Sequence, residues 1–200
     1  MKLGPRYKIA KRLGASIFEK TQTRAFMVSK ERSAAAKKFR RAGSDYSRQL
    51  IEKQKLRLTY CLTERQFSSY VKKALASHVN PQAALYILLE SRLDSTIYRM
   101  GLAATRRAAR QIVSHGHILV NGTRITIPSF RVSKGDVISI REGSKDSALF
   151  TALAERLKEH HAPSWVSFDP SKNEGSFTGD PVLTQGETAD IGAVFEFYTR

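Results

Sequence analysis

The sequence predicts an α+β protein in which two short helices lead into a small antiparallel sheet, beside a helical domain and a basic N-terminal arm. Three observations support this prediction. Apolar residues recur at helical spacing in two short segments between residues 92 and 114. Asn121-Gly122, which lies between alternating apolar residues, is the strongest short signal for a β-hairpin. Residues 1–41 contain thirteen Lys or Arg residues and only two acids.

The first short helix is expected over about residues 92–100. Its apolar side recurs every three or four positions, at Leu93, Ile97 and Met100. Ser91 and Asp94 approximate a capping box at the start of this helix. Gly101 can adopt the left-handed conformation that closes a helix, so the helix is expected to end there.

The second short helix is expected after Thr105, whose hydroxyl can cap the first turn. Its apolar side consists of Ala108, Ala109, Ile112 and Val113. Its cationic side consists of Arg106, Arg107 and Arg110. Because these arginines lie within one turn of each other, we expect all three to reach the same ligand. His115-Gly116 ends the helix.

The predicted sheet follows directly. Apolar residues alternate on both sides of the Asn121-Gly122 turn, at Ile118, Val120, Ile125 and Ile127. A third strand is expected over residues 137–140, because residues 133–136 read Ser-Lys-Gly-Asp and supply a turn before it.

A helical domain is expected over residues 44–90. Thr63 and Gln66 form a capping box for one of its helices. The apolar side of that helix is formed by Phe67, Tyr70, Val71, Ala74 and Leu75. Asn80-Pro81 starts the next helix. One more helix, with balanced charge, is expected over residues 147–161.

The charge of the chain points to a polyanionic partner. In 200 residues there are 34 Lys and Arg against 18 Asp and Glu, a net charge of +16. RNA, DNA and an anionic membrane surface all carry the complementary charge. No apolar run approaches the roughly 20 residues that span a bilayer, so we expect no membrane insertion. Cys61 is the single cysteine, which excludes an intramolecular disulfide and a cysteine-rich zinc site.

The N-terminal arm has few residues that could form a core. We therefore expect residues 1–41 to become ordered on a partner, with a solvated tail as the alternative. The other end of the chain has the opposite charge. From Asp169 onward there are six acids against Lys172 and Arg200, so this end should face away from a polyanion or toward a basic protein.

Several motifs in the middle of the chain resemble the S-four RNA-binding domain. They are Arg92-Leu93-Asp94, the Tyr98-Arg99-Met100-Gly101 step, the helix that begins Ala104-Thr105-Arg106-Arg107, the hairpin of residues 114–122 and Val132-Ser133-Lys134-Gly135-Asp136. Domains of this kind occur in several protein families. The resemblance by itself therefore implies RNA binding.

The flanking segments resemble the small-subunit ribosomal protein S-four family. They are Gly4-Pro5 with Lys11-Arg12, Ser44-Asp45-Tyr46 with the helix after it, and the terminal residues from Asp190. Many members carry a four-cysteine zinc knuckle in the arm. This chain resembles the metal-free form, so no metal and no cofactor are expected. It departs from that form at residues 33–36, where a Gly-Gln-His-Gly-type loop is usual, and at Gly192-Ala193.

The resemblance implies a domain organisation and a function. The domains are a basic arm at 1–43, a helical domain at 44–90 that is completed by about 180–200, and an S-four RNA-binding domain at 91–179. The last of these includes a C-terminal packing segment in which Trp165 is expected to pack rather than stack on a base.

The implied role is early binding of small-subunit ribosomal RNA, which nucleates assembly of its five-prime domain. The implied neighbours are ribosomal protein S-five and the messenger entry channel. The implied location is the small ribosomal subunit, in the cytoplasm or in an organelle.

The residues expected to bind RNA are basic, aromatic or turn residues of these segments. They are Arg6, Lys8, Lys11, Arg12, Lys37, Lys38, Arg40, Arg41, Tyr46, Arg48, Lys53, Lys55, Arg57, Arg65, Arg92, Arg99, Arg106, Arg107, Arg110, His115 and Asn121. His115 and His117 either contact RNA or have a simple turn role. The basic run from Lys37 to Arg41 either holds messenger at the entry channel or anchors ribosomal RNA.

Two other functions compete with the ribosomal one. Pseudouridine synthases use an aspartate in a similar Arg-Leu-Asp setting, but no other segment is long enough for their catalytic domain. We therefore expect Asp94 to pair with a neighbouring arginine and the chain not to be an enzyme. A heat-shock or quality-control protein built on an S-four domain would explain the middle of the chain, but not the resemblance at both ends.

Overall fold

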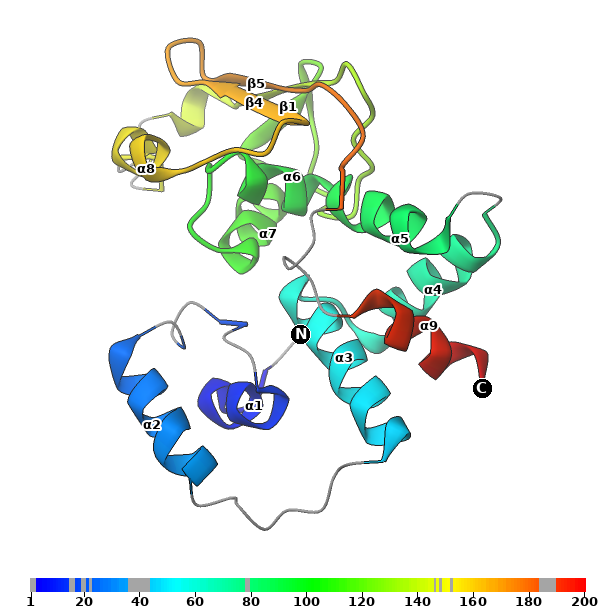
Figure 1. Ribbon diagram of the computed structural model, residues 1–200. Helices are drawn as coiled ribbons and strands as arrows, with labels where there is room; N and C mark the ends of the chain where they lie inside the picture. The colour runs from blue at the N-terminus through cyan, green and yellow to red at the C-terminus, as the bar shows by residue number, and fades with distance from the viewer. Residues whose placement is uncertain are drawn as a thin grey trace. The chain divides into compact units, whose positions relative to one another are not determined.

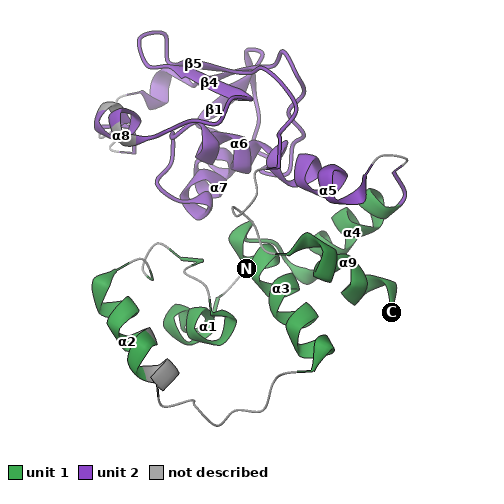
Figure 2. Ribbon diagram, viewed as in Figure 1, with its two compact units in different colours: residues 1–75, 184–200 green, residues 76–183 purple. Residues whose placement is uncertain are grey.

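The structure is a computed structural model. It describes residues 3–14, 17–18, 21, 23–35, 44–77, 80–145, 147, 149–151, 153–183 and 190–200. The chain divides into two compact units (Figure 2), here called unit 1 (residues 1–75 and 184–200) and unit 2 (residues 76–183). No helix in these described ranges has the length and apolar character needed to cross a membrane.

The first part of unit 1 contains two helices, α1 (Arg6–Leu13) and α2 (Arg24–Ala35). Ala10, Phe18 and Phe26 are each at most 6% exposed and form a small apolar cluster. Lys11 Nζ donates to Ser29 Oγ at 2.6 Å, and so connects the two helices. The described part of this stretch therefore has a small core, while the ordering of residues 1–41 on a partner stays a prediction. Its apolar residues are few, but they are spaced so that they meet.

The rest of unit 1 is a bundle of α3 (Asp45–Thr59), α4 (Glu64–Leu75) and the terminal helix α9 (Ile191–Thr199). The predicted capping box of α4 is confirmed, since Thr63 N donates to Gln66 Oε1 and Gln66 N donates to Thr63 Oγ1, both at 3.3 Å. Asp190 Oδ1 caps α9 by accepting from Ala193 N at 3.2 Å. The change from the usual family residues there thus leaves a capped helix.

A buried lysine connects the three helices of this bundle. Lys53 of α3 is 5% exposed, and its Nζ lies 2.8 Å from Glu64 Oε1 of α4 and 4.5 Å from the centre of the Phe197 ring of α9. Tyr198 Oη donates to the same Glu64 oxygen at 2.6 Å. Partial burial acts to raise the pKa of Glu64, but the hydrogen bonds and charges of Lys53, Tyr198 and Arg57 outweigh it and hold this pKa below its ordinary value.

Unit 2 begins with helices α5, α6 and α7 and continues into a sheet and its connections (Figure 1). The elements are α5 (Pro81–Glu90), α6 (Leu93–Arg99), α7 (Arg106–Ser114), β1 (Ile118–Val120), β2 (Thr123–Arg124), β3 (Val137–Ile140), the 3-10 turn η2 (Glu142–Ser144), α8 (Leu153–Glu159), β4 (Val166–Asp169) and β5 (Glu174–Phe177). The strand order is β2-β1-β3-β5-β4, with every pair antiparallel. The predicted α+β class is confirmed.

The core of unit 2 lies between α6, α7 and one face of the sheet. Its fully buried residues include Leu93, Ile97, Val113, Ile118 and Ile138. At roughly 2 kcal/mol for each buried aliphatic side chain, this core is the main source of stability in the unit. It also holds α7 in position, because the apolar side of that helix packs into the core.

Local signals in unit 2 mostly predict its structure correctly. Thr105 Oγ1 accepts from Ala108 N at 2.9 Å and caps α7, as predicted. Val120 pairs with Thr123, and the two turn residues between them, Asn121 (φ 49°) and Gly122 (φ 78°), have the positive φ values of a type I′ hairpin. The capping box expected at Ser91 is wrong, because Arg92 is the N-cap of α6 and no side chain caps that helix.

Longer-range features of unit 2 differ from the prediction. The alternation after the hairpin ends early, since β2 stops at Arg124 and Ile127 is 59% exposed. The helix expected over residues 147–161 is shorter, and β4 and β5 were not predicted. Gly175 in β5 is a residue that usually interrupts a strand. Here glycine is needed because β4 and β5 lie very close together, and a Cβ at this position would lie 2.7 Å from the Ser167 carbonyl oxygen. Trp165 packs in the core, as predicted, at 5% exposure.

The lowered pKa of Glu64 predicts how unit 1 responds to acid. A carboxyl group whose pKa is depressed by folding stabilises the fold above its ordinary pKa of 4.5, and this contribution is lost as the pH falls through the lower folded value. Glu64→Gln should therefore lower Tm by about 2–4 °C at pH 7, or roughly 1 kcal/mol. The difference from the parent should shrink as the pH falls below 4.5.

The matched control is Glu31→Gln, which changes one exposed acid of α2 and should leave Tm within about 1 °C. Thermal melts at several pH values measure both variants. A Glu64→Gln difference that stays constant down to pH 3 would contradict this account of the ion pair.

Candidate RNA-binding surface

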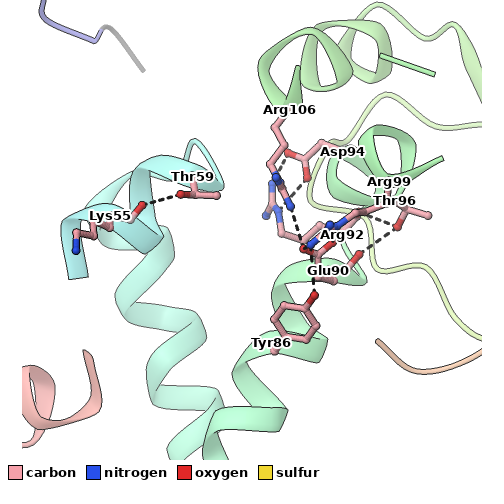
Figure 3. Close-up of polar contacts among 9 residues, drawn as sticks. All are labelled: Lys55, Thr59, Tyr86, Glu90, Arg92, Asp94, Thr96, Arg99 and Arg106. Atoms are coloured by element: carbon pink, nitrogen blue, oxygen red, sulfur yellow. Dashed lines mark hydrogen bonds and ion pairs between the residues drawn. The ribbon is translucent and has the colours of Figure 1, made fainter. Parts of the chain in front are cut away.

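The side chain at the centre of unit 2 is a buried acid. Glu90 ends α5 and is 0% exposed. Arg99 of α6 hydrogen-bonds both carboxylate oxygens of Glu90. Its Nη2 donates to Oε1 at 2.8 Å, and its Nε donates to Oε2 at 3.1 Å. Arg106 of α7 donates from Nη2 to Oε1 at 2.9 Å (Figure 3). One carboxylate therefore ties three consecutive helices together, and we call these residues the Glu90 cluster.

A second buried pair lies beside this cluster. Arg92 is 1% exposed, and its Nε and Nη2 donate to the two carboxylate oxygens of Asp94 at 3.0 and 2.7 Å. This bidentate geometry is the strong form of a charge-assisted hydrogen bond. Asp94 is thus the partner of a neighbouring arginine, as the sequence analysis expected. Because both side chains are held inside the fold, we leave Arg92 out of the proposed RNA-binding surface.

The three arginines of α7 differ in their surroundings. Arg106 is bound to Glu90, and its guanidinium carbon lies 4.5 Å from the centre of the Tyr98 ring, so its side chain is only 14% exposed. Arg107 is exposed and Arg110 is partly exposed. That all three reach the same ligand stays a prediction, but Arg106 is held by a buried acid that no local pattern in the sequence reveals. We call Arg107 and Arg110 the α7 pair.

The basic residues of unit 1 divide in the same way. Lys53 is buried against Glu64, Lys55 Nζ lies 2.5 Å from Glu52 Oε1, and Arg57 is within 3.5 Å of Glu64 Oε2. The exposed residues of the expected set in this unit are Lys8, Arg12, Tyr46, Arg48 and Arg65, while Arg6 and Lys11 are partly exposed. Only the exposed members can meet a large ligand without a change in the fold.

Two other expected residues lie at the sheet end of unit 2. Asn121 has a structural role, because its Nδ2 donates to Asp136 Oδ1 at 2.8 Å and its Oδ1 accepts from Val137 N at 2.9 Å. His115 is exposed at the C-terminal end of α7. The four basic residues Lys37, Lys38, Arg40 and Arg41 lie outside the described residues.

The sequence analysis missed three residues on exposed surface. Arg124 and Arg141 are exposed next to the end of α7, and Tyr7 is 49% exposed in the basic helix α1, with its ring centre 5.7 Å from that of Phe26. Antiparallel pairing could have revealed the two arginines, since Arg124 lies in β2 and Arg141 directly follows β3, and both strands pair with β1. Within the described part of the chain, no group of three or more His, Cys, Asp or Glu residues could hold a metal ion.

The Glu90 cluster predicts a large loss of stability when its acid is removed. Glu90→Gln leaves two arginines in a largely buried site without their anion, and breaking a buried pair in this way costs about 3–5 kcal/mol. Denaturant unfolding should report a loss of that size. Glu142→Gln is the matched control, because Glu142 pairs with Lys145 at 3.4 Å but its side chain is 92% exposed, so it should change stability by less than about 1 kcal/mol. Equal effects of the two changes would contradict a structural role for Glu90.

Comparisons with known proteins cover nearly the whole chain. A family model of the S4 domain matches residues 91–138, and a model of the ribosomal protein S4/S9 N-terminal domain matches residues 2–90. The chain is 43% identical over 205 residues to the small ribosomal subunit protein uS4 of Shewanella loihica, which covers 99% of this chain and 98% of that protein. It is also 43% identical over 196 residues to the protein of the same name from Shewanella violacea, with 96% and 92% covered. These matches confirm the resemblance that the motifs carried, and the chain belongs to the small ribosomal subunit protein uS4 family.

Proposed function

We propose that this protein is a structural component of the small ribosomal subunit that binds the RNA of that subunit. The observation that carries the proposal is the α7 pair, which presents Arg107 and Arg110 on a helix whose third arginine is locked to Glu90. An exposed charge on a fixed helix can meet a phosphate without first losing conformational freedom. Membership of the uS4 family supports the same role, and it supports a non-enzymatic protein.

The proposed mechanism is electrostatic and depends on shape. Each Lys or Arg that neutralises a phosphate releases counterions, so a chain of net charge +16 can gain much of its affinity this way. Folded RNA offers few base edges and is recognised largely through its backbone and shape. Arginine suits this task, because its planar guanidinium contacts a phosphate through two donors. The exposed basic residues of unit 1 would add a second group of phosphate ligands.

The role in assembly is the finer part of the proposal. By resemblance to its family, the chain would bind early to a junction in the five-prime domain of the RNA and hold it for later proteins. Two stable units with exposed basic residues are suited to this task. The acids Asp169 and Glu174, exposed on β4 and β5, would face away from the RNA. A heat-shock or quality-control role is disfavoured, because the similarity to uS4 proteins covers 99% of the chain rather than the S4 domain alone.

A second role at the messenger entry channel, beside ribosomal protein S-five, rests on the resemblance. The basic run Lys37, Lys38, Arg40 and Arg41 would supply it. Positive side chains hold a single strand through its backbone without regard to sequence, and they oppose its re-pairing. The alternative is that this run anchors ribosomal RNA.

The α7 pair gives the first test of the proposed function. Arg107→Ala combined with Arg110→Ala should weaken binding to the five-prime domain RNA more than tenfold, or over about 1.4 kcal/mol. The slope of log affinity against log salt should fall in magnitude by about two, because each of the two arginines neutralises about one phosphate. The free energy of unfolding should change by less than about 1 kcal/mol, because charges at or near the surface contribute little to folding.

The matched control is Lys134→Ala combined with Lys172→Ala, which removes the same charge from exposed turns of unit 2. It should reduce affinity less than threefold. Filter binding across a salt series compares the two double variants. Equal losses of affinity would mean that net charge, rather than the α7 surface, governs binding, and the proposal would then lose its main support.

The basic run provides a separate test. Alanine at Lys37, Lys38, Arg40 and Arg41 should still allow assembly into small subunits, but should slow translation through stable messenger hairpins downstream of the start. Unstructured messengers should be translated at the parent rate. Failure to assemble, or equal slowing of both messengers, would identify the run as a ribosomal RNA anchor.

A further inference from the structure

A histidine lies where α7 meets the sheet, and the fold holds its ring on several sides. His117 Nδ1 is 2.9 Å from Ser144 Oγ, and Ser144 is buried in η2. The Phe150 ring packs edge-on against the imidazole, with ring centres 6.3 Å apart. The His117 carbonyl accepts from Arg141 N at 2.9 Å. Because Nδ1 is engaged with Ser144, Nε2 is the ring atom that remains for a ligand.

Arg124 is held in place next to this histidine. Its Nε donates to the Gly116 carbonyl and its Nη2 to the His115 carbonyl, both at 3.2 Å, so the guanidinium caps the C-terminal end of α7. Gly116 makes this possible, because a Cβ at that position would clash with the Arg124 guanidinium. The backbone of Gly116 also has a φ of 73°, which favours glycine. A cation is thus fixed at this point by the backbone of the preceding turn.

The charges that act on the pKa of His117 are all positive. Burial lowers the pKa of His117 first, and the charges of His115, Arg141 and Arg124 lower it further. The ring centres of His115 and His117 are 6.0 Å apart. Glu142, the acid two residues before Ser144, has a side chain that is 92% exposed and is paired with Lys145. Among the described residues, the charges of His115, Arg124 and Arg141 therefore all act on the His117 ring, and a cationic set of this kind attracts an external anion.

We infer that His115, His117, Arg124 and Arg141, here called the His117 site, bind a phosphodiester group of the RNA backbone and that His117 takes up a proton when they do. The inference deepens the proposed function and rests on it. The His117 site is separate from the α7 pair in its chemistry, because the arginines of that pair keep their charge at every pH near neutrality.

The proton linkage follows from the charges. In the free protein burial, and after it the surrounding cations, lower the pKa of His117 below its ordinary value of 6.5 and so favour the neutral ring near pH 7. A bound phosphate adds a negative charge and stabilises the imidazolium. The proton comes from solvent, and no covalent bond forms or breaks. Binding that takes up a proton becomes tighter as the pH falls. RNA affinity should therefore rise as the pH is lowered from 8 toward 6, up to a limit of about tenfold per pH unit for one proton.

The test measures affinity for the five-prime domain RNA at constant ionic strength between pH 6 and pH 8. The parent protein should bind at least about threefold more tightly at pH 6 than at pH 7.5. His117→Gln, whose amide can still bond Ser144, should lose at least half of this pH dependence. His161→Gln, which changes an exposed histidine elsewhere, should keep all of it. Arg141→Ala should weaken binding more than threefold at pH 6.

The outcomes separate this inference from the proposed function. If Arg107→Ala weakens binding at every pH but His117→Gln keeps the parent's pH dependence, the His117 site is overturned and the proposed function stands. If the parent protein does not bind the RNA at all, the proposed function itself fails. A flat pH profile for the parent also overturns the inference.

A second measurement avoids any risk that a variant misfolds. The imidazole resonance of His117 in the parent protein is followed by NMR during a pH titration, with and without RNA. RNA should raise the pKa of His117, and an unchanged pKa would contradict the inference. A parallel titration with inorganic phosphate distinguishes the source of the anion. A site that responds to millimolar phosphate but not to RNA would be a free-phosphate site, which also overturns the inference.

Discussion

The contact on which unit 2 most depends is the one between the Glu90 carboxylate and two arginines. A fully buried acid is costly to desolvate unless it is paired, and Arg99 and Arg106 together donate three hydrogen bonds to it. Because the three residues come from α5, α6 and α7, the ion cluster links these consecutive helices to one another, in addition to the apolar core that buries one side of α7. The Arg92–Asp94 pair holds the first turn of α6 next to this cluster. This cluster and the apolar core together fix the helix that carries the α7 pair.

A consequence is that basic residues in this protein have two distinct tasks. Some hold the fold from inside, as Arg92 does in unit 2 and Lys53 does in unit 1, and others stay at the surface, where a phosphate can reach them. The net charge of +16 counts both kinds alike. The electrostatic attraction that steers the protein toward RNA depends on the net charge of the whole chain. The affinity of the bound state depends on the exposed basic residues, which contact phosphates. Loss of a buried cation should therefore reduce stability, and loss of an exposed one should reduce affinity.

The sequence predicted features whose causes are local and failed where the cause lies far along the chain. The Thr105 cap, the capping box of Thr63 and Gln66 and the Asn121-Gly122 turn depend on residues within three positions of each other. The burial of Arg106 depends on Glu90, sixteen residues away, and no spacing pattern reveals that pair. Strands β4 and β5 were missed because Gly175 reads as a breaker until the close approach of Ser167 is known. The list of expected RNA-binding residues stays a prediction, but the structure shows that some of its side chains, such as Lys53 and Arg92, are buried in ion pairs.

The most direct test of these two roles follows the NMR signals of all the arginine side chains in one experiment. The Nε–Hε resonances of the full chain can be recorded by NMR while the five-prime domain RNA is added. The account predicts that Arg107 and Arg110 shift with RNA, while Arg92, Arg99 and Arg106 keep their positions because their partners are Asp94 and Glu90. Resonances of the buried arginines that move as far as those of the α7 pair would contradict the account, since the fold would then have to open for the RNA to bind.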